Sequence, residues 1–178
     1  EDFAAAARAL IARGWTTPGN ITIHGGSAGG LLVGATVNLA PELFRAAVAE
    51  VPFVDVLTTM LDDTLPLTPP EWPEWGNPIE SATDYATIKA YAPYENIREI
   101  DYPHILATGG LTDPRVTYWE PAKWIARLRA RRTDDGLTLL RTEMTAGHGG
   151  KAGRFNQLHE VAFVYAFVIF VHTVLKEK

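Results

Sequence analysis

Hydrophobic residues recur along the chain in two alternating patterns: short apolar or β-branched runs, and longer amphipathic stretches. The short runs predict four strands, at residues 21–23, 46–51, 105–108 and 137–142. The longer stretches predict helices at residues 3–13, 31–39, 81–91, 118–132 and 154–176, with a shorter helix at 54–61 and Ser81 as an N-cap. Because the strands alternate with helices long enough to cross over a sheet, we expect an α/β fold: about four mostly parallel strands with helices on both faces.

Two stretches stand apart from this alternation. Residues 64–78 contain five prolines, and proline fixes φ and lacks a backbone donor, so this stretch predicts an ordered surface loop. Residues 161–171 form the longest apolar run, which is shorter than the roughly 20 residues that span a bilayer. We therefore expect a buried C-terminal helix there and no membrane partner.

Composition narrows the class of protein. The chain has 178 residues, 47% hydrophobic and 21% charged, which is typical of one soluble globular domain. Its 16 basic and 21 acidic residues give a net charge of −5, which argues against nucleic acid as a partner. The absence of cysteine excludes disulfides and cysteine nucleophiles. No histidine pair has the spacing of a ligand motif, so we expect no metal and no cofactor.

A serine follows the first predicted strand in a glycine-rich turn. Residues 25–29 match G-x-S-x-G, in which glycines let the chain turn sharply and force the serine into a strained conformation. Ser27 would be a nucleophile, and the N–H of Ala28 at the helix N-terminus would donate to an oxyanion. Five residues alone also fit a plain turn, but their place between a β-branched strand and a small-residue helix favours a catalytic serine.

Two later turns carry a carboxylate and an imidazole. Asp113 follows the strand at 105–108, where it can face the carboxyl edge of the sheet, although an aspartate before proline is also common in turns. His148 follows the strand at 137–142 between glycines that give it room over a cleft, or that merely form a loop. The other histidines lie in strands or in the last helix, where packing or solvation accounts for them.

The three residues together point to one chemistry. Each follows a predicted strand, and they occur in the order Ser, Asp, His, which is the chain order of α/β-hydrolases. In that arrangement Ser27 attacks a carbonyl and His148 takes its proton, while Asp113 holds the correct tautomer of His148. The sequence therefore predicts a Ser-His-Asp hydrolase.

Over nearly its whole length the chain resembles the prolyl oligopeptidase family of serine peptidases, and most closely its oligopeptidase B (protease II) subgroup. The matching stretches are GGSAGG (25–30), VPFVDV (51–56), TTM (58–60), EWGNP (74–78), YWEPAKW (118–124) and GHGGK (147–151). The resemblance implies an α/β-hydrolase fold and cleavage of short peptides after Arg or Lys.

The resemblance also assigns substrate-binding residues. Glu71 matches a glutamate that receives the basic P1 side chain, and a carboxylate can hold a guanidinium through two hydrogen bonds. The family often has a second acidic residue where this chain has Pro73, so Glu74 is the remaining candidate for a further basic preference. Arg115 matches an arginine that donates to a substrate carbonyl. Solvated loop charges and a surface salt bridge are the alternatives for these three side chains.

Family members carry an N-terminal β-propeller and a first half of the hydrolase sheet that residues 1–178 do not contain. We therefore expect residues 1–178 to be the C-terminal part of a catalytic domain, with an exposed edge at the first strand and the upstream part of its own chain as a partner. The second oxyanion donor, a tyrosine in the family, would also lie upstream. Losing one such donor costs roughly 100- to 1,000-fold in rate, so low activity is expected of this chain alone.

Two alternatives stay open beside the basic-residue oligopeptidase. One keeps the chemistry and changes the substrate: a prolyl- or acylaminoacyl-type peptidase, or an esterase on the same fold. The other is a non-catalytic fragment. Cytoplasm is the default expectation for location, because no export signal is visible.

Overall fold

The computed structural model describes residues 1–175. They form one four-stranded sheet and the helices around it. The elements follow in the order α1 (Asp2–Ala12), β1 (Ile21–Gly26), α2 (Ala28–Leu39), the 3-10 turn η1 (Pro41–Leu43), β2 (Phe44–Glu50), α3 (Val56–Met60), α4 (Thr68–Trp75), α5 (Ala82–Tyr91), β3 (His104–Gly110), α6 (Trp119–Arg131), β4 (Thr138–Glu143) and α7 (Arg154–Thr173).

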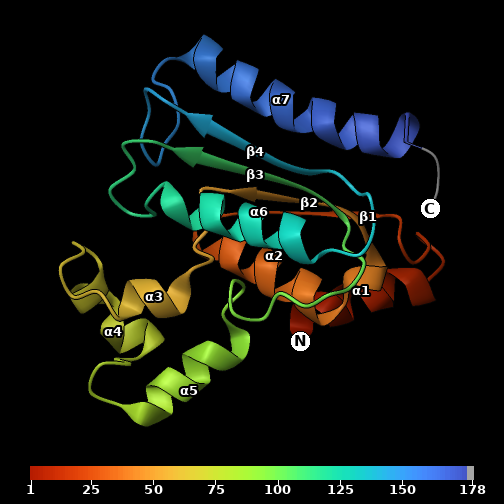
Figure 1. The fold of residues 1–178 in the computed structure, drawn as a ribbon. Helices are drawn as coiled ribbons and strands as arrows, with labels where there is room; N and C mark the ends of the chain where they lie inside the picture. The colour runs from red at the N-terminus through yellow and green to blue at the C-terminus, as the bar shows by residue number, and fades with distance from the viewer. Residues whose placement is uncertain (176–178) are drawn as a thin grey trace.

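The sheet has the strand order β1-β2-β3-β4, and every neighbouring pair is parallel. Figure 1 shows α1, α2 and α6 on one face of the sheet and α7 on the other. The predicted α/β fold, with about four parallel strands and helices on both faces, is confirmed. Since all four strands run the same way, their carboxyl ends meet at one edge, where binding and catalytic residues of such sheets gather.

The two faces of the sheet are covered unequally. Alternate strand residues on one face pack against α1, α2 and α6 in a cluster that includes Ile23, Val33, Ala47, Ile105 and Trp124. On the other face a smaller cluster joins the strands to α7; its buried members are Ala46, Val48, Leu106, Val164, Phe167 and Val171. Both strand faces are apolar, as expected for a parallel sheet with helices on both sides.

Helices α3, α4 and α5 form a small lobe beside the main layers (Figure 1), and a further hydrophobic cluster joins the lobe to α2. Its buried residues are Leu31, Phe53, Val56, Leu57, Met60, Ile88, Ala92 and Val116. Ser81 caps α5 as predicted, because its hydroxyl accepts the N–H of Asp84 at 3.1 Å. The lobe matters for function because α3 and α4 border the serine.

The prediction of a loop over residues 64–78 is wrong in its middle, where α4 forms. Two of the prolines, Pro69 and Pro70, lie in the first turn of α4, where the backbone N–H would have no partner in the helix. Pro73 lies inside the helix, but the helix has only eight residues and ends at Gly76 with a φ of 102°. The prolines are therefore compatible with a short helix, which presents its glutamates differently from a loop.

The prediction of a buried C-terminal helix is also wrong. Only one stripe of α7 packs on the sheet, and many of its other apolar residues are exposed: Phe155, Leu158, Val161, Phe163, Tyr165, Ile169 and Phe170. By length and composition α7 could cross a membrane, although a single helix of this kind is a weak indication of one. The predicted end of this helix at residue 176 lies outside the described residues.

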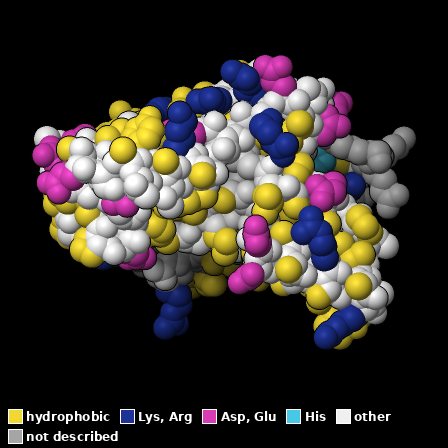
Figure 2. All heavy atoms as spheres, turned by 90° about the horizontal axis from the view of Figure 1, so that it is seen from below, with side chains coloured by type: hydrophobic (Ala, Val, Ile, Leu, Met, Phe, Trp, Pro, Cys, Tyr) yellow, Lys and Arg dark blue, Asp and Glu magenta, His cyan; other side chains and the backbone are white. Residues whose placement is uncertain are grey.

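The face of the molecule seen from below in Figure 1 carries charges of both signs. Figure 2 shows Lys and Arg side chains interspersed with Asp, Glu and apolar side chains over this face. Such mixing is ordinary for a soluble protein surface.

Candidate active site

Ser27 lies between the end of β1 and the start of α2, in a strained backbone conformation. Its φ of 55° and ψ of −121° lie outside the regions that non-glycine residues favour. Two hydrogen bonds hold the turn against the end of β2: the Ser27 N–H donates to the Glu50 carbonyl at 2.8 Å, and the Phe53 N–H donates to the Ser27 carbonyl at 3.0 Å. The strain is therefore maintained by the neighbouring strand.

The glycines around Ser27 are not equally necessary. A Cβ on Gly25 would lie 2.3 Å from the Gly29 carbonyl oxygen, and one on Gly30 would lie 2.4 Å from Cβ of Pro52. A Cβ on Gly29 would meet nothing within 4 Å. An added side chain would therefore clash at Gly25 and not at Gly29, because Gly29 contributes only its backbone carbonyl to the close contact.

Asp113 and His148 are brought together although they are 35 positions apart. His148 Nδ1 lies 2.7 Å from Asp113 Oδ2. The other carboxylate oxygen, Oδ1, accepts the backbone N–H groups of Arg115 at 2.8 Å and Val116 at 3.0 Å. Because the Asp113 side chain is fully buried and that of His148 is 21% exposed, the carboxylate is fixed and one edge of the imidazole is open to solvent.

The histidine and the serine face two separate hollows at the carboxyl edge of the sheet. His148 lines one of about 280 Å³ together with Glu50, Thr108 and Gly110. Ser27 lines another of about 140 Å³, and within residues 1–175 no hydrogen bond joins its hydroxyl to His148. Hydrogen bonds between catalytic groups are often long in unliganded enzymes and tighten when substrate binds.

The hollow beside the serine, called the Ser27 pocket below, gathers the residues that the sequence singled out for substrate binding. Glu71, Glu74 and Arg115 all line it, as does Ala28 at the start of α2. Its remaining walls are Phe53, Thr59, Met60, Leu67, Trp75 and Val116. Two carboxylates, one guanidinium and an apolar wall therefore surround one opening next to the serine.

Helix α4 fixes the position of Glu71. Glu71 Oε2 accepts the indole N–H of Trp75 at 3.1 Å, and the Trp75 ring packs edge-on against Phe53 with 5.5 Å between ring centroids. Glu71 is half-buried, whereas Glu74 and Arg115 are exposed. Of the three charged side chains, Glu71 is therefore the one with a defined orientation in the pocket.

Sequence reasoning missed Glu120, a carboxylate behind the pocket. Glu120 is fully buried in the first turn of α6, and burial raises the pKa of its carboxyl to about 7, with a further upward contribution from Asp55. Hydrogen bonds from Val54, Asp55 and Thr59 act in the opposite direction. One signal was available: Glu120 lies four and eight residues before the buried Trp124 and Leu128, on the apolar stripe of an amphipathic helix.

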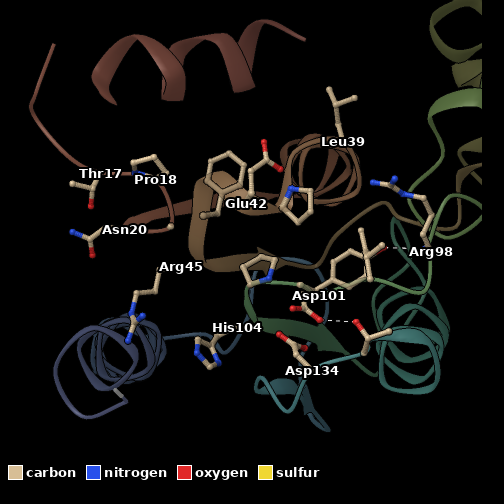
Figure 3. Close-up of a pocket in the computed structure, with 17 residues that line it drawn as sticks. Thr17, Pro18, Asn20, Leu39, Glu42, Arg45, Arg98, Asp101, His104 and Asp134 are labelled. Carbon is tan, nitrogen blue, oxygen red and sulfur yellow. Dashed lines mark hydrogen bonds between the residues drawn. The ribbon is translucent and has the colours of Figure 1, made fainter. Parts of the chain in front are cut away.

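A cavity larger than these two hollows lies elsewhere. It measures about 940 Å³ and opens at the amino ends of the strands, between the segments around Asn20, Phe44 and His104 (Figure 3). Figure 3 shows Arg45, Arg98, Asp101 and Asp134 around it, none of which adjoins Ser27. In parallel sheets of this type ligands bind at the carboxyl ends of the strands, so the smaller hollows at Ser27 and His148 are the candidate site.

Three of the remaining four histidines have polar partners away from the Ser27 pocket, and the fourth, His159, lies exposed on α7. His24 pairs with Glu50, the His104 Nδ1 accepts the Leu137 N–H at 3.0 Å, and His172 bonds Thr22 at 2.7 Å. Among residues 1–175, no group of three or more His, Asp or Glu side chains is arranged to hold a metal ion.

Comparison with known proteins identifies the family. A model of the prolyl oligopeptidase family matches residues 1–172. Over 168 residues the chain is 55% identical to Protease 2 of Moraxella lacunata and 48% identical to dipeptidyl aminopeptidase BI of Pseudoxanthomonas mexicana, covering 94% of this chain in both cases. It superposes on oligopeptidase B from Leishmania major with a TM-score of 0.94 and 47% identity over 96% of this chain.

The chain spans about a quarter of the length of these relatives: 24% of Protease 2, 23% of the aminopeptidase and 24% of oligopeptidase B. The match to the family model nevertheless runs over almost all of residues 1–178. The chain belongs to the prolyl oligopeptidase family.

Proposed function

We propose that the complete gene product containing this chain is a serine oligopeptidase that cleaves short peptides after Arg or Lys. The observation that carries the proposal is that Ser27 and an oriented glutamate, Glu71, line one pocket. A carboxylate in the same pocket as a nucleophile suits a basic P1 side chain, because it can bind a guanidinium through two hydrogen bonds. The similarity to proteins named Protease 2 and oligopeptidase B supports the same substrate class.

The proposed mechanism is acyl transfer through Ser27. Its hydroxyl oxygen attacks the scissile carbonyl while His148 Nε2 takes the proton and then gives it to the leaving amine. Asp113 keeps the proton of neutral His148 on Nδ1 and stabilises the imidazolium, consistent with the 2.7 Å contact. The Ala28 N–H donates to the oxyanion, and Arg115 donates to a substrate carbonyl. In the second half of the reaction, water attacks the acyl-enzyme while His148 takes its proton, and His148 then returns a proton to the Ser27 oxygen as the ester breaks.

Glu71 is proposed as the P1 receptor and Glu74 as a second, weaker determinant. Glu71 Oε2 already accepts the Trp75 indole N–H, so Oε1 is the freer oxygen for a substrate guanidinium. Glu74 is exposed at the rim of the same pocket, where solvent screens its charge. Its contribution to selectivity is therefore expected to be smaller.

The upstream part of the gene product is the proposed partner of this chain. β1 is an edge strand of the four-stranded sheet, and an unpaired edge favours pairing with another strand. The relatives are about four times as long as this chain, which is consistent with further strands and a second oxyanion donor upstream. Activity is accordingly expected of the complete gene product rather than of this chain alone.

The test is hydrolysis of short arylamides that end in Arg, Ala or Pro by the complete gene product and by its Ser27→Ala and Glu71→Ala variants. We expect Arg-selective turnover that disappears in Ser27→Ala, and a loss in Glu71→Ala that is confined to the Arg substrate. Glu80→Ala is the matched control, because Glu80 is exposed and its side chain makes no hydrogen bond within residues 1–175. Turnover of Ala or Pro substrates without a preference for Arg would contradict the assignment of Glu71.

A dipeptidyl aminopeptidase is the second candidate, favoured by the 48% identity to a relative of that name. The two candidates differ in whether the substrate needs a free amino terminus. Cleavage of an N-terminally blocked Arg arylamide at the rate of the unblocked one supports the oligopeptidase, whereas cleavage of the unblocked substrate alone supports the aminopeptidase.

A further inference from the structure

Glu120 belongs to the YWEPAKW stretch that helped to identify the family, yet it does not line the Ser27 pocket. It is fully buried at the start of α6, and the other buried residues of this helix are all hydrophobic. A carboxylate taken out of water costs free energy unless its oxygens accept hydrogen bonds. The partners of Glu120 therefore indicate what its burial achieves.

Both oxygens of Glu120 bond to one short segment of chain, residues 54–59. Oε2 accepts the backbone N–H of Val54 at 3.1 Å and that of Asp55 at 3.0 Å. Oε1 accepts the hydroxyl of Thr59 at 2.8 Å. This segment begins directly after Phe53 and contains Thr59, and both of these residues are walls of the Ser27 pocket.

The contacts continue from that segment to the helix of Glu71. The hydroxyl of Thr68, the first residue of α4, donates to the Thr59 carbonyl at 2.8 Å, and Thr68 is fully buried. The Trp72 indole N–H donates to the Met60 carbonyl at 3.1 Å. A continuous set of hydrogen bonds therefore runs from α6 through α3 to α4.

We propose that Glu120 is a positioning residue for the Ser27 pocket, fixing the wall formed by Phe53 and Thr59 and, through Thr68, the helix that carries Glu71. Its role is to set where the P1 side chain is held relative to Ser27. The inference rests on the proposed function, because it concerns the same pocket. A purely structural role would lower stability and affect all substrates alike, whereas a positioning role acts on the substrate whose side chain enters the pocket.

The test uses Glu120→Ala and Glu120→Gln in the complete gene product, compared at equal concentrations of folded protein. Three reactions are measured. Two are the hydrolysis of an Arg arylamide and of an Ala arylamide, each giving KM and kcat. The third is the labelling of Ser27 by a small phosphonate, which gives a rate. We expect Glu120→Ala to raise KM for the Arg substrate about 10- to 100-fold, because small misplacements at a binding wall are costly. The Ala substrate and the labelling rate should change less than about threefold on the same argument.

Glu120→Gln should recover most of the affinity for the Arg substrate. Its amide oxygen can still accept the N–H groups of Val54 and Asp55, and its NH₂ group can donate to the Thr59 hydroxyl. Glu80 is exposed and lies in the same lobe, so Glu80→Ala should leave the constants for both arylamides and the labelling rate unchanged. Equal losses for all substrates and for labelling in Glu120→Ala, or no recovery in Glu120→Gln, would overturn the proposal.

If Glu120→Ala does not fold, Thr59→Val and Thr68→Val test the same contacts with smaller changes. Each removes one hydroxyl and keeps the shape of the side chain, so each should raise KM for the Arg substrate several-fold and spare the phosphonate reaction. No change in selectivity in either variant would reject the proposal.

The failure of this inference can be told apart from the failure of the proposed function. If the unmodified protein prefers another P1 residue, the assignment of basic substrates fails. The Glu120 variants are then compared on the preferred substrate and the Ala arylamide. If no arylamide is turned over but the phosphonate labels Ser27, competition of an Arg peptide aldehyde with labelling replaces KM.

Discussion

Two of the segments that carry proposed site residues, those of Glu71 and of His148, are held in different ways. The Glu71 wall, residues 53–75, is joined to α6 by the Thr59 hydroxyl, which donates to Glu120, and to itself by the Thr68 hydroxyl, which donates to the Thr59 carbonyl. Phe53, Val56, Leu57 and Met60 add a buried apolar cluster beneath it. The wall is therefore fixed by both packing and hydrogen bonding.

The His148 loop, residues 144–153, has far fewer buried contacts. Most of its residues are exposed or half-buried. Its middle is closed by the backbone bridge between Gly147 and Gly150, and the Lys151 N–H donates to Glu160 on α7 at 3.1 Å. The bond to Asp113 is the one hydrogen bond that the His148 ring makes within residues 1–175.

The difference indicates what each segment depends on. Segments with many buried contacts open at a higher free-energy cost than segments with few. We expect the Glu71 wall to keep its shape when a single contact at its surface is lost, and His148 to lose its placement when Asp113 changes. Substrate selection and proton transfer should then respond to different mutations.

The largest effect should come from Asp113→Asn. The Asn oxygen can still accept the Arg115 and Val116 N–H groups, so its NH₂ group faces His148 Nδ1 and imposes the wrong tautomer. We expect kcat to fall by about 10⁴-fold with little change in KM. Asp135→Asn, an exposed aspartate, is the matched control. A loss below about tenfold would mean that Asp113 does not orient the base.

The next effect concerns the pH dependence of stability at the Glu71 wall. Burial raises the pKa of Glu120 to about 7 in the folded protein, against 4.5 for a glutamate in water. The folded state therefore binds the proton more tightly, and the stability contributed by this group is present below pH 4.5 and lost as pH rises towards 7. Asp55 adds to the shift, although its own carboxylate pairs with Lys123.

Comparing unmodified protein with Glu120→Gln isolates this group, since Gln does not titrate. Relative to the unmodified protein, the free energy of unfolding of the Gln variant should rise by up to about 3 kcal/mol between pH 4.5 and 8. Urea unfolding of both proteins at three pH values measures it. A constant difference across this range would contradict the raised pKa.

A smaller loss should follow from moving the His148 loop without touching its side chains. A Cβ on Gly110 would lie 2.6 Å from the carbonyl oxygens of Ala146 and Gly147, so Gly110→Ala must displace the loop. A displacement of about 1 Å at a catalytic group costs roughly 100-fold, and we expect that loss in kcat for Arg and Ala substrates alike. At Gly149 an added Cβ would meet nothing within 4 Å, and Gly149→Ala serves as the control. If Gly110→Ala lowered kcat for the Arg substrate alone, the His148 loop and the Glu71 wall would not respond to different mutations.

Much of the fold could be predicted because its strands and helices have distinct periodicities and the glycine-rich turns mark their ends. The four strands, the helices between them and the turns of Ser27, Asp113 and His148 follow from that local information. Two errors have a common cause. Whether residues 68–75 form a helix, and how much of α7 is buried, depends on what packs against them, which short-range patterns do not contain.

The candidate site was predictable to a similar extent. Ser27, Asp113 and His148 could be found because each follows a strand of a parallel sheet, and Glu71 came from the resemblance to a family. Glu120 was missed because glutamates are common in the first turn of a helix, where the helix dipole stabilises their negative charge. Its place on the apolar stripe of α6 is the one local signal, and the long-range contacts with Val54, Asp55 and Thr59 set it apart from such a residue.

The smallest expected effect tests the outer part of the lobe. Ser81 caps α5, and Ser81→Ala removes the acceptor of the Asp84 N–H, which should cost about 1 kcal/mol of stability. Thr87→Ala, at an exposed position in the middle of the same helix, is the control and should be neutral or slightly stabilising, because Ala has the higher helix propensity. Because α5 does not line the Ser27 pocket, KM for the Arg substrate should stay unchanged in both variants. A rise in KM for Ser81→Ala comparable with that of Glu120→Ala would mean that the wall depends on the whole lobe rather than on its hydrogen bonds to α6.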